Sequence, residues 1–288
     1  MSYILFTDSS ADLPWSYYKE HDVRFIPMQV SMDDDVYIDD GSMDSKTFYQ
    51  KMRDGVVFKT SQYSEYQFLE VFEPVLKEDK DILYLGLTMG LSGSHESACR
   101  VRDQLKEKYP GRTVFVPQTS AVSLGLGLMI HETVKQRDAG LDFEELCQWA
   151  RENMLTFHHR FTVDDLMFLF RGGRVSRASA IVGTALSIKP RLHVDINGKL
   201  INHGKIRGRK ASLLGLVEEM RQYCDQKDHD AIAICHGDCE DEAQFVLEEV
   251  RKHFNVNHAI INPLAAAIGT HVGPGCMALF FVGKKRTE

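Results

Sequence analysis

The sequence predicts an α/β fold organised in two lobes. Short apolar runs alternate with helical patterns through the first half of the chain, as a mostly parallel sheet with flanking helices requires. In the second half, Asn197 and Gly198 separate two extended segments, which is typical of a β-hairpin. With 288 residues, the chain has the length at which one domain usually becomes two. We expect an N-terminal α/β lobe over 1–157 and a C-terminal α/β lobe over 158–288.

Composition and charge exclude several classes of protein. The formal net charge of -7 creates a negative field that repels nucleic-acid phosphates, so no nucleic-acid partner is expected. No apolar run has the length of a signal peptide or a membrane span, which argues against stable membrane insertion. The six cysteines are scattered and contain no Cys-x-x-Cys pair, which predicts reduced thiols in a cytoplasmic protein without a disulfide framework.

The first elements place polar groups at the end of a strand. Tyr3–Thr7 is an apolar run typical of a buried strand, and the polar turn 8–14 precedes a helix that ends near Glu20. Ligands bind at the carboxyl ends of strands in open α/β sheets, so Asp8 and the serines after it are candidate neighbours of a site. Plain helix capping is the alternative interpretation.

The next segment has the apolar content of a second strand, over Val23–Val30, with Pro27 indicating an edge or a bulge. The aspartates at 33–35 and 39–40 lack the ligand spacing of a calcium loop, and we interpret them as a solvated acidic loop. A short helix is predicted over 42–54, closed by Gly55.

Two segments bring hydroxyl groups to the start of a helix. Residues 58–64 carry three Ser or Thr hydroxyl groups and an amide, and Ser64 with Gln67 forms a potential capping box. Later, the apolar run 82–87 stops at small and hydroxyl residues, after which 94–109 has the spacing of a helix.

This second turn is the one around which we expect the chain to be organised. Ser92 and Ser94 add hydroxyl donors to the free N–H groups of a helix start, so a carboxylate or phosphate oxygen could be held there without a cationic side chain. Helix capping by Ser94 is the alternative.

The middle of the chain contains patterns that resemble cofactor sites only weakly. A strand is predicted over 113–117, and a helix over 142–154. Gly125 and Gly127 lack the third glycine of a dinucleotide loop, so we interpret them as close helix-to-sheet contacts. His158 and His159 point apart in an extended chain and make a poor metal pair, so a packing or surface role is expected.

An apolar helix over 166–170 ends at a double glycine flanked by arginines. Arg171 and Arg174 are suited to carboxylates of the protein or of a ligand. A second apolar helix is predicted over 178–186, and the hairpin over 191–205 follows. The basic run 205–210 is interpreted either as a solvated helix start or as a docking point for phosphate or an acidic partner.

The pattern of the last third of the sequence predicts a strand over 230–235, an amphipathic helix over 241–254 and strands over 259–261 and 277–282. Cys235, His236 and Cys239 supply only three soft ligands, so no metal site is expected. His271 lies among small residues, where we expect an exposed ring able to bind an acid head group or move a proton.

Six motifs, in order over residues 3–283, resemble those of the DegV family. They lie at 60–62, 91–94, 171–176, 189–190, 207–211 and 269–275. The resemblance implies one DegV-type domain in which a long-chain fatty acid is buried in a cavity between the lobes. It also implies a non-catalytic carrier subunit of a bacterial fatty acid kinase, which acts in phospholipid synthesis. A separate ATP-binding subunit would then phosphorylate the carboxylate to an acyl phosphate.

The resemblance assigns site residues to this sequence. It implies that Thr60 and Ser92 hold the carboxylate, with His271 nearby. Supporting positions are expected at Ser61, Gly93, Ser94, Thr270 and Arg171, and a surface for the kinase subunit or the acyl phosphate at Arg207, Arg209 and Lys210. No cofactor and no metal are expected.

Two other classes of function stay open at this point. A serine hydrolase would use Ser92 as nucleophile and His271 as base, although the Gly-x-Ser-x-Gly elbow is absent. A phosphate- or nucleotide-binding protein would use the same turns with Arg171, Arg174 and Arg207. The tail of a fatty acid, in contrast, requires a deep apolar cavity.

Overall fold

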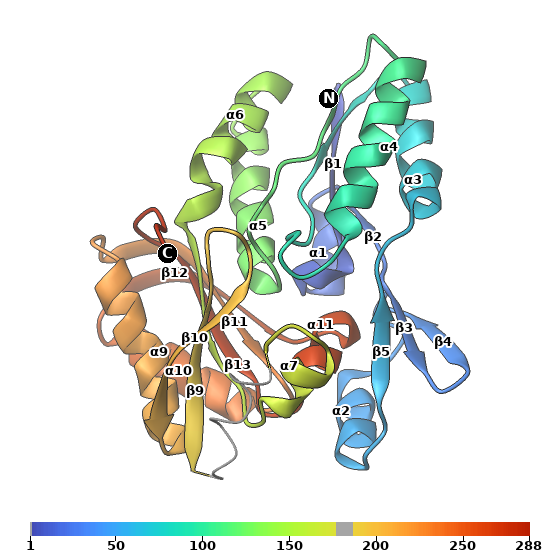
Figure 1. The fold of residues 1–288 in the computed structure, drawn as a ribbon. Helices are drawn as coiled ribbons and strands as arrows, with labels where there is room; N and C mark the ends of the chain where they lie inside the picture. The colour runs from blue at the N-terminus through green and yellow to red at the C-terminus, as the bar shows by residue number, and fades with distance from the viewer. Residues whose placement is uncertain (1, 177–186) are drawn as a thin grey trace.

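The computed structural model describes residues 2–176 and 187–288, whose strands form three sheets (Figure 1). The first sheet is parallel and has the order β2-β1-β6-β7. Its strands are β1 (Tyr3–Asp8), β2 (Val23–Ile26), β6 (Asp81–Tyr84) and β7 (Val114–Phe115). The predicted parallel sheet of the N-terminal half is therefore confirmed.

The second sheet is small and antiparallel, with the order β4-β3-β5. It consists of β3 (Gln29–Met32), β4 (Asp35–Ile38) and β5 (Phe58–Ser61). The prediction of one strand over Val23–Val30 is wrong. Pro27 lies between β2 and β3, and since proline cannot donate to a ladder, the chain leaves the first sheet there and enters the second.

The third sheet is mixed and has the order β10-β9-β8-β13-β11-β12. Its strands are β8 (Phe157–Thr162), β9 (Ile188–Val194), β10 (Leu200–Arg207), β11 (Asp228–His236), β12 (Asn255–Pro263) and β13 (Met277–Val282). The predicted hairpin is confirmed as β9 and β10, joined at Asn197-Gly198, with Gly198 at a φ of 75°.

Helices pack against the sheets (Figure 1). They are α1 (Trp15–Glu20), α2 (Ser45–Arg53), α3 (Glu65–Lys77), α4 (Ser94–Lys108), α5 (Leu124–Asp138), α6 (Phe143–Asn153), α7 (Met167–Arg171), α9 (Arg209–Tyr223), α10 (Glu240–Arg251) and α11 (Ala266–Val272). The capping box of Ser64 and Gln67 is present at the start of α3. The helix predicted over 178–186 lies outside the described residues. No helix within the described ranges has the length and hydropathy to cross a membrane.

The first two sheets and the third sheet are formed by separate parts of the chain, but some helices pack against sheets of the other part. The four- and three-stranded sheets use residues 3–115, and the six-stranded sheet uses 157–282. Helix α5 nevertheless packs on β8, β11 and β13, while α11 packs on β3 and β5 (Figure 1). One apolar cluster accordingly runs from Leu5 and Leu83 to Ala233 and Phe280. The lobe boundary at 157/158 stays a prediction.

Two buried aspartates attach α11 to the N-terminal half. The carboxylate of Asp39 accepts hydrogen bonds from the backbone N–H groups of Ala266 and Ala267, at 3.2 and 3.1 Å. Asp12 accepts one from Ala265 at 2.9 Å. The interpretation of 39–40 as a solvated loop is therefore wrong for Asp39, which is buried because it satisfies the free donors of a helix start.

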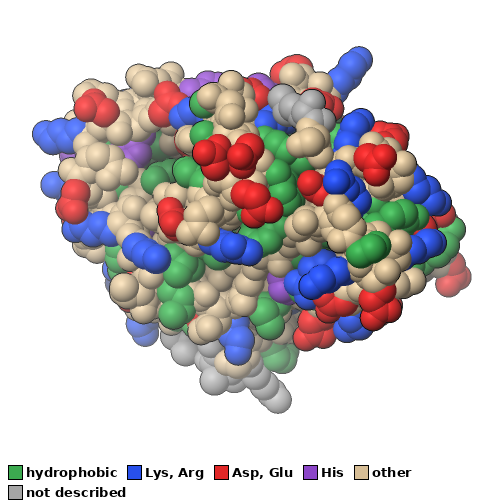
Figure 2. Space-filling view, turned by 90° about the horizontal axis from the view of Figure 1, so that it is seen from above, with side chains coloured by type: hydrophobic (Ala, Val, Ile, Leu, Met, Phe, Trp, Pro, Cys, Tyr) green, Lys and Arg blue, Asp and Glu red, His purple; other side chains and the backbone are tan. Residues whose placement is uncertain are grey.

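The surface carries charges of both signs. Figure 2 shows one face, on which acidic and basic side chains are interspersed among apolar ones. All six cysteines are free thiols.

Candidate functional site

The central turn is held in place by Asp8. Its carboxylate accepts hydrogen bonds from the Tyr84 hydroxyl at 2.6 Å and the Leu87 N–H at 2.9 Å. This contact follows from the topology, since β1 and β6 are parallel neighbours whose carboxyl ends meet at the same edge. Asp8 thus anchors the start of the loop that leads to Ser92, and burial raises the pKa of its carboxyl.

Ser94 joins the two hydroxyl-bearing segments. Its Oγ accepts a hydrogen bond from the Tyr63 N–H at 3.1 Å and lies 2.8 Å from Ser92 Oγ. Gly93 occupies the cap position of α4 and makes no side-chain cap, so the alternative that Ser94 caps this helix is wrong. A Cβ at Gly93 would collide with Gln62 Oε1, so glycine permits the close approach of the two segments.

Thr60 and His271 meet from opposite halves of the chain. Thr60 lies on β5, His271 lies on α11, and 2.8 Å separate Thr60 Oγ1 from His271 Nε2. Burial, with the positive charge of Arg174 nearby, lowers the pKa of His271 to about 4, so its imidazole is neutral at pH 7. The expectation of an exposed ring is wrong, because the ring is half-buried and its Nδ1 faces Gly172.

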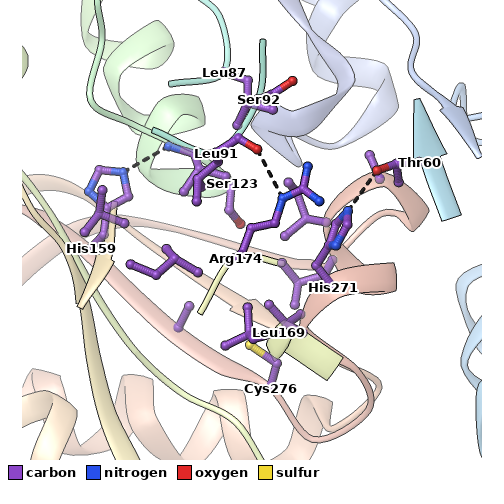
Figure 3. A pocket seen from close by; sticks show the side chains of 18 of the residues that line it. Thr60, Leu87, Leu91, Ser92, Ser123, His159, Leu169, Arg174, His271 and Cys276 are labelled. Atoms are coloured by element: carbon purple, nitrogen blue, oxygen red, sulfur yellow. Dashed lines mark hydrogen bonds between the residues drawn. The ribbon is translucent and has the colours of Figure 1, made fainter. Parts of the chain in front are cut away.

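Arg174 is a site residue that the sequence analysis did not select for the head group. Its side chain donates to Leu91 O at 3.1 Å and to Gly172 O, and Figure 3 shows its guanidinium between the Ser92 turn and His271. No carboxylate of the described residues pairs with this half-buried cation, whose pKa is lowered by burial. A cationic side chain therefore lies beside the neutral donors that the sequence indicates, and the use of neutral donors alone for the head group stays a prediction.

Arg171, the arginine predicted to support the site, points elsewhere. Its guanidinium lies 4.5 Å from the centre of the Phe168 ring, and it lines an outer groove, not the cavity. The two arginines differ in position because α7 ends at Arg171 and the Gly172-Gly173 turn separates it from Arg174. Arg174, and not Arg171, therefore lines the cavity.

Behind these polar groups lies an apolar cavity, whose empty space amounts to about 770 Å³ when the part open to solvent is counted with it. Thr60, Ser92, Arg174 and His271 lie at its polar end (Figure 3), and Ser61 and Gln62, next to Thr60 in the chain, also line the cavity. The remaining wall is mostly aliphatic and aromatic, and it is formed by both halves of the chain: Met28, Leu87, Leu91, Val122, Phe161, Leu169, Val194, Leu200, Leu264, Ala267, Ile268, Val272, Ala278 and Phe280. A cavity of this composition suits a long apolar ligand with one polar end.

The hairpin closes part of this cavity. Val194 and Leu200 line it from β9 and β10, and the tip at Gly198 contacts the central turn at Thr88 and Gly90. A Cβ at Gly198 would collide with Thr88 Oγ1, which explains the need for glycine at this position.

The other predicted site residues lie apart from the cavity. Thr270 is buried and donates its hydroxyl to Ala266 O at 2.8 Å within its own helix. Arg209 forms ion pairs with Glu242 and Asp164, so it is engaged inside the protein. Arg207 and Lys210 are exposed. Over 2–176 and 187–288, no group of three potential metal ligands comes together, Cys235, His236 and Cys239 included.

The fold and the cavity define a class of protein: a two-lobed α/β protein with an apolar cavity whose polar end carries hydroxyl groups, an imidazole and an arginine. The model of the DegV family matches residues 3–284. A DegV domain-containing protein of Clostridium perfringens is 38% identical over 98% of this chain and 97% of its own length. The chain belongs to the DegV family.

Solved structures of family members share the fold. A DegV lipid-binding protein of Thermotoga maritima superposes with a TM-score of 0.87 at 29% identity, over the whole of both chains. A DegV family protein of Thermus thermophilus, described as binding fatty acid, has a TM-score of 0.88 at 30% identity over 98% of this chain and 100% of its own. DegV of Bacillus subtilis, described as a fatty acid binding protein, has a TM-score of 0.84 at 27% identity over 99% and 100%.

Proposed function

We propose that this protein binds one long-chain fatty acid in the cavity, with the carboxylate at the polar end beside Thr60, Ser92, Arg174 and His271. The observation that carries the proposal is the position of Arg174. It is a half-buried cation without a carboxylate partner among the described residues, at the mouth of an apolar cavity. A ligand carboxylate would supply the missing negative charge, and charge-assisted hydrogen bonds are stronger than neutral ones.

The surrounding groups suit a carboxylate. Thr60 and Ser92 can each donate a hydroxyl hydrogen, and the neutral imidazole of His271 carries one N–H. Because Arg174 already donates to two carbonyl oxygens, it presents only part of its guanidinium to the ligand. This geometry favours a single contact over a bidentate clamp, and it leaves one carboxylate oxygen free for attack on a phosphoryl group.

The apolar wall supplies the affinity. At ~0.8 kcal/mol per buried methylene, an acyl tail of about 16 carbons contributes roughly 12 kcal/mol before ordering costs. The head group then fixes the position of the ligand, and the tail holds it.

We further propose that the bound acid is presented to a separate ATP-dependent kinase subunit, which phosphorylates it to an acyl phosphate, so that this chain is a carrier and not catalytic alone. The family resemblance supports this step, and the exposed Arg207 and Lys210 supply positive charge for an acidic partner or the new phosphate. Incubation of the loaded protein with such a kinase and labelled ATP should yield labelled acyl phosphate only when the fatty acid is present.

A serine hydrolase is disfavoured by two contacts. His271 Nε2 bonds Thr60, and Ser92 Oγ bonds Ser94 Oγ, so the described residues form no Ser92–His271 pair and no acid orients the imidazole. A nucleotide-binding function is disfavoured by the aliphatic wall.

The proposal is tested by comparing palmitate with its methyl ester and with hexadecanol in a fluorescence displacement assay. All three bury the same tail, but palmitate alone offers a carboxylate. We expect the acid to bind at least about tenfold more tightly. Equal affinity for all three would remove the head-group assignment, and no binding of any would overturn the lipid-binding proposal.

A further inference from the structure

A histidine lines the end of the cavity that lies away from Thr60 and His271. His159 lies on β8 and is buried, and Figure 3 shows it on the side of the cavity opposite Thr60 and His271. Its ring therefore lies where the methyl end of a bound acyl chain would arrive, whereas the polar groups of the mouth lie at the carboxylate.

Both ring nitrogens of His159 are used. Nε2 accepts a hydrogen bond from the Val122 N–H at 3.3 Å, and Nδ1 lies 3.1 Å from Phe157 O. These two partners require a neutral imidazole with its hydrogen on Nδ1, since a carbonyl oxygen can only accept. Burial lowers the pKa of this imidazole well below its usual value, which agrees with the neutral form. The ring is thus fixed at two points and has no free polar atom for a ligand.

The ring is closely packed on α5. Gly125 lies against it, and a Cβ at this position would collide with Nε2 and Cδ2 of His159. Phe280 meets the ring edge-on, with 5.5 Å between the ring centres. Since close-packed interiors resist displacement, the imidazole forms a rigid wall.

The neighbouring polar group at this end is also occupied. Ser123 Oγ donates to Asp12 Oδ2 at 2.6 Å and lies 3.4 Å from Cys235 Sγ. A hydroxyl or carboxyl group at the end of an acyl chain would therefore be buried here without a partner, which is costly. The far end suits a methyl group.

We propose that His159, held against Gly125, is the stop that sets the maximum length of the acyl chain and selects a terminal methyl group. This inference rests on the proposed fatty acid binding and adds a specificity-determining residue to it. An acid that is too long must displace the ring or leave methylenes outside the cavity, and each methylene left in water forfeits about fourfold in affinity.

The test is a competition by native mass spectrometry among equimolar laurate, myristate, palmitate, stearate and arachidate. The wild-type protein is compared with His159→Ala and with His159→Asn, whose side-chain amide can still donate to Phe157 O while the outer half of the ring is removed. We expect both variants to shift the preferred acid toward longer chains by about two methylenes, which is about 15-fold in relative affinity. Gly125→Ala, whose added methyl group would collide with the ring, should also change the preferred chain length.

His158→Ala is the matched control. His158 is the neighbouring buried histidine on β8, but its ring stacks on Phe281 and bonds Lys284 O at 2.7 Å, away from the cavity. The His158→Ala variant should prefer the same acyl chain length as the wild type. An unchanged preference in His159→Asn, with the variant folded and loaded, would overturn the inference and leave the proposed function intact. A wild-type protein that binds none of the five acids would instead overturn the proposed function itself.

Discussion

His271 Nε2 lies 2.8 Å from the hydroxyl oxygen of Thr60, and this contact joins α11 to β5 at the mouth of the cavity. The two residues are 211 positions apart in the chain. The contact therefore fixes one side of the site and also connects the two halves of the molecule there.

Thr60→Val should weaken the binding of palmitate while preserving the shape of the side chain. A hydrogen bond to a charged group contributes about 1.5–3 kcal/mol, so the dissociation constant should rise by roughly 10- to 100-fold. The matched control is Thr270→Val, because the Thr270 hydroxyl is bonded within its own helix. Fluorescence displacement measures both variants, and equal effects of the two would contradict the role of Thr60.

Arg174→Gln should reduce affinity for the acid by about tenfold or more, with a much smaller effect on hexadecanol, since the glutamine keeps a donor but loses the charge. Arg171→Gln is the control: it lies on the other side of the double glycine and contacts Phe168. Isothermal titration with each ligand separates the two arginines. The assignment fails if Arg171→Gln impairs acid binding and Arg174→Gln does not.

Asp39 should make stability depend on pH. Burial raises the pKa of its carboxyl to about 6, above the value near 4 in the unfolded chain. The stabilisation of its protonated form is therefore complete below about pH 4 and is lost as the pH rises through about 6. Urea unfolding should show that the wild type loses about 2–3 kcal/mol relative to Asp39→Asn between about pH 4 and pH 7. A wild type that gains stability relative to the variant over this range would contradict the assignment.

The ring of His271 should titrate far below an ordinary histidine. Its pKa of about 4 in the folded protein lies under the unfolded value near 6.5, so the stability that its neutral form contributes is present above about pH 6.5 and is lost as the pH falls toward 4. Nitrogen NMR of the ring, assigned with His271→Gln, should find a neutral imidazole at pH 6. A midpoint above pH 6 in the unliganded protein is incompatible with this environment.

The sequence predicted the local elements better than the contacts between them. The hairpin at Asn197-Gly198 and the capping box at Ser64 depend only on residues that are close in sequence, so the sequence predicts both. The partition at Pro27 into two sheets was missed because an apolar run does not reveal which sheet it joins.

The same limit applies to the site. Thr60, Ser92 and His271 were selected by resemblance, whereas Arg174 was ranked behind Arg171 because composition does not show which side of a glycine turn faces a cavity. The burial of Asp39 was missed because its partner, the backbone N–H of Ala266, is far away in the chain.

The most direct test of the account is mass spectrometry of the purified protein under native and denaturing conditions, with palmitate and oleate added to a delipidated sample. The account predicts one fatty acid per chain, retained in the native spectrum and released on denaturation, and reduced occupancy in Arg174→Gln. A protein that carries no lipid after purification and takes up neither acid would contradict fatty acid binding by this member of the DegV family.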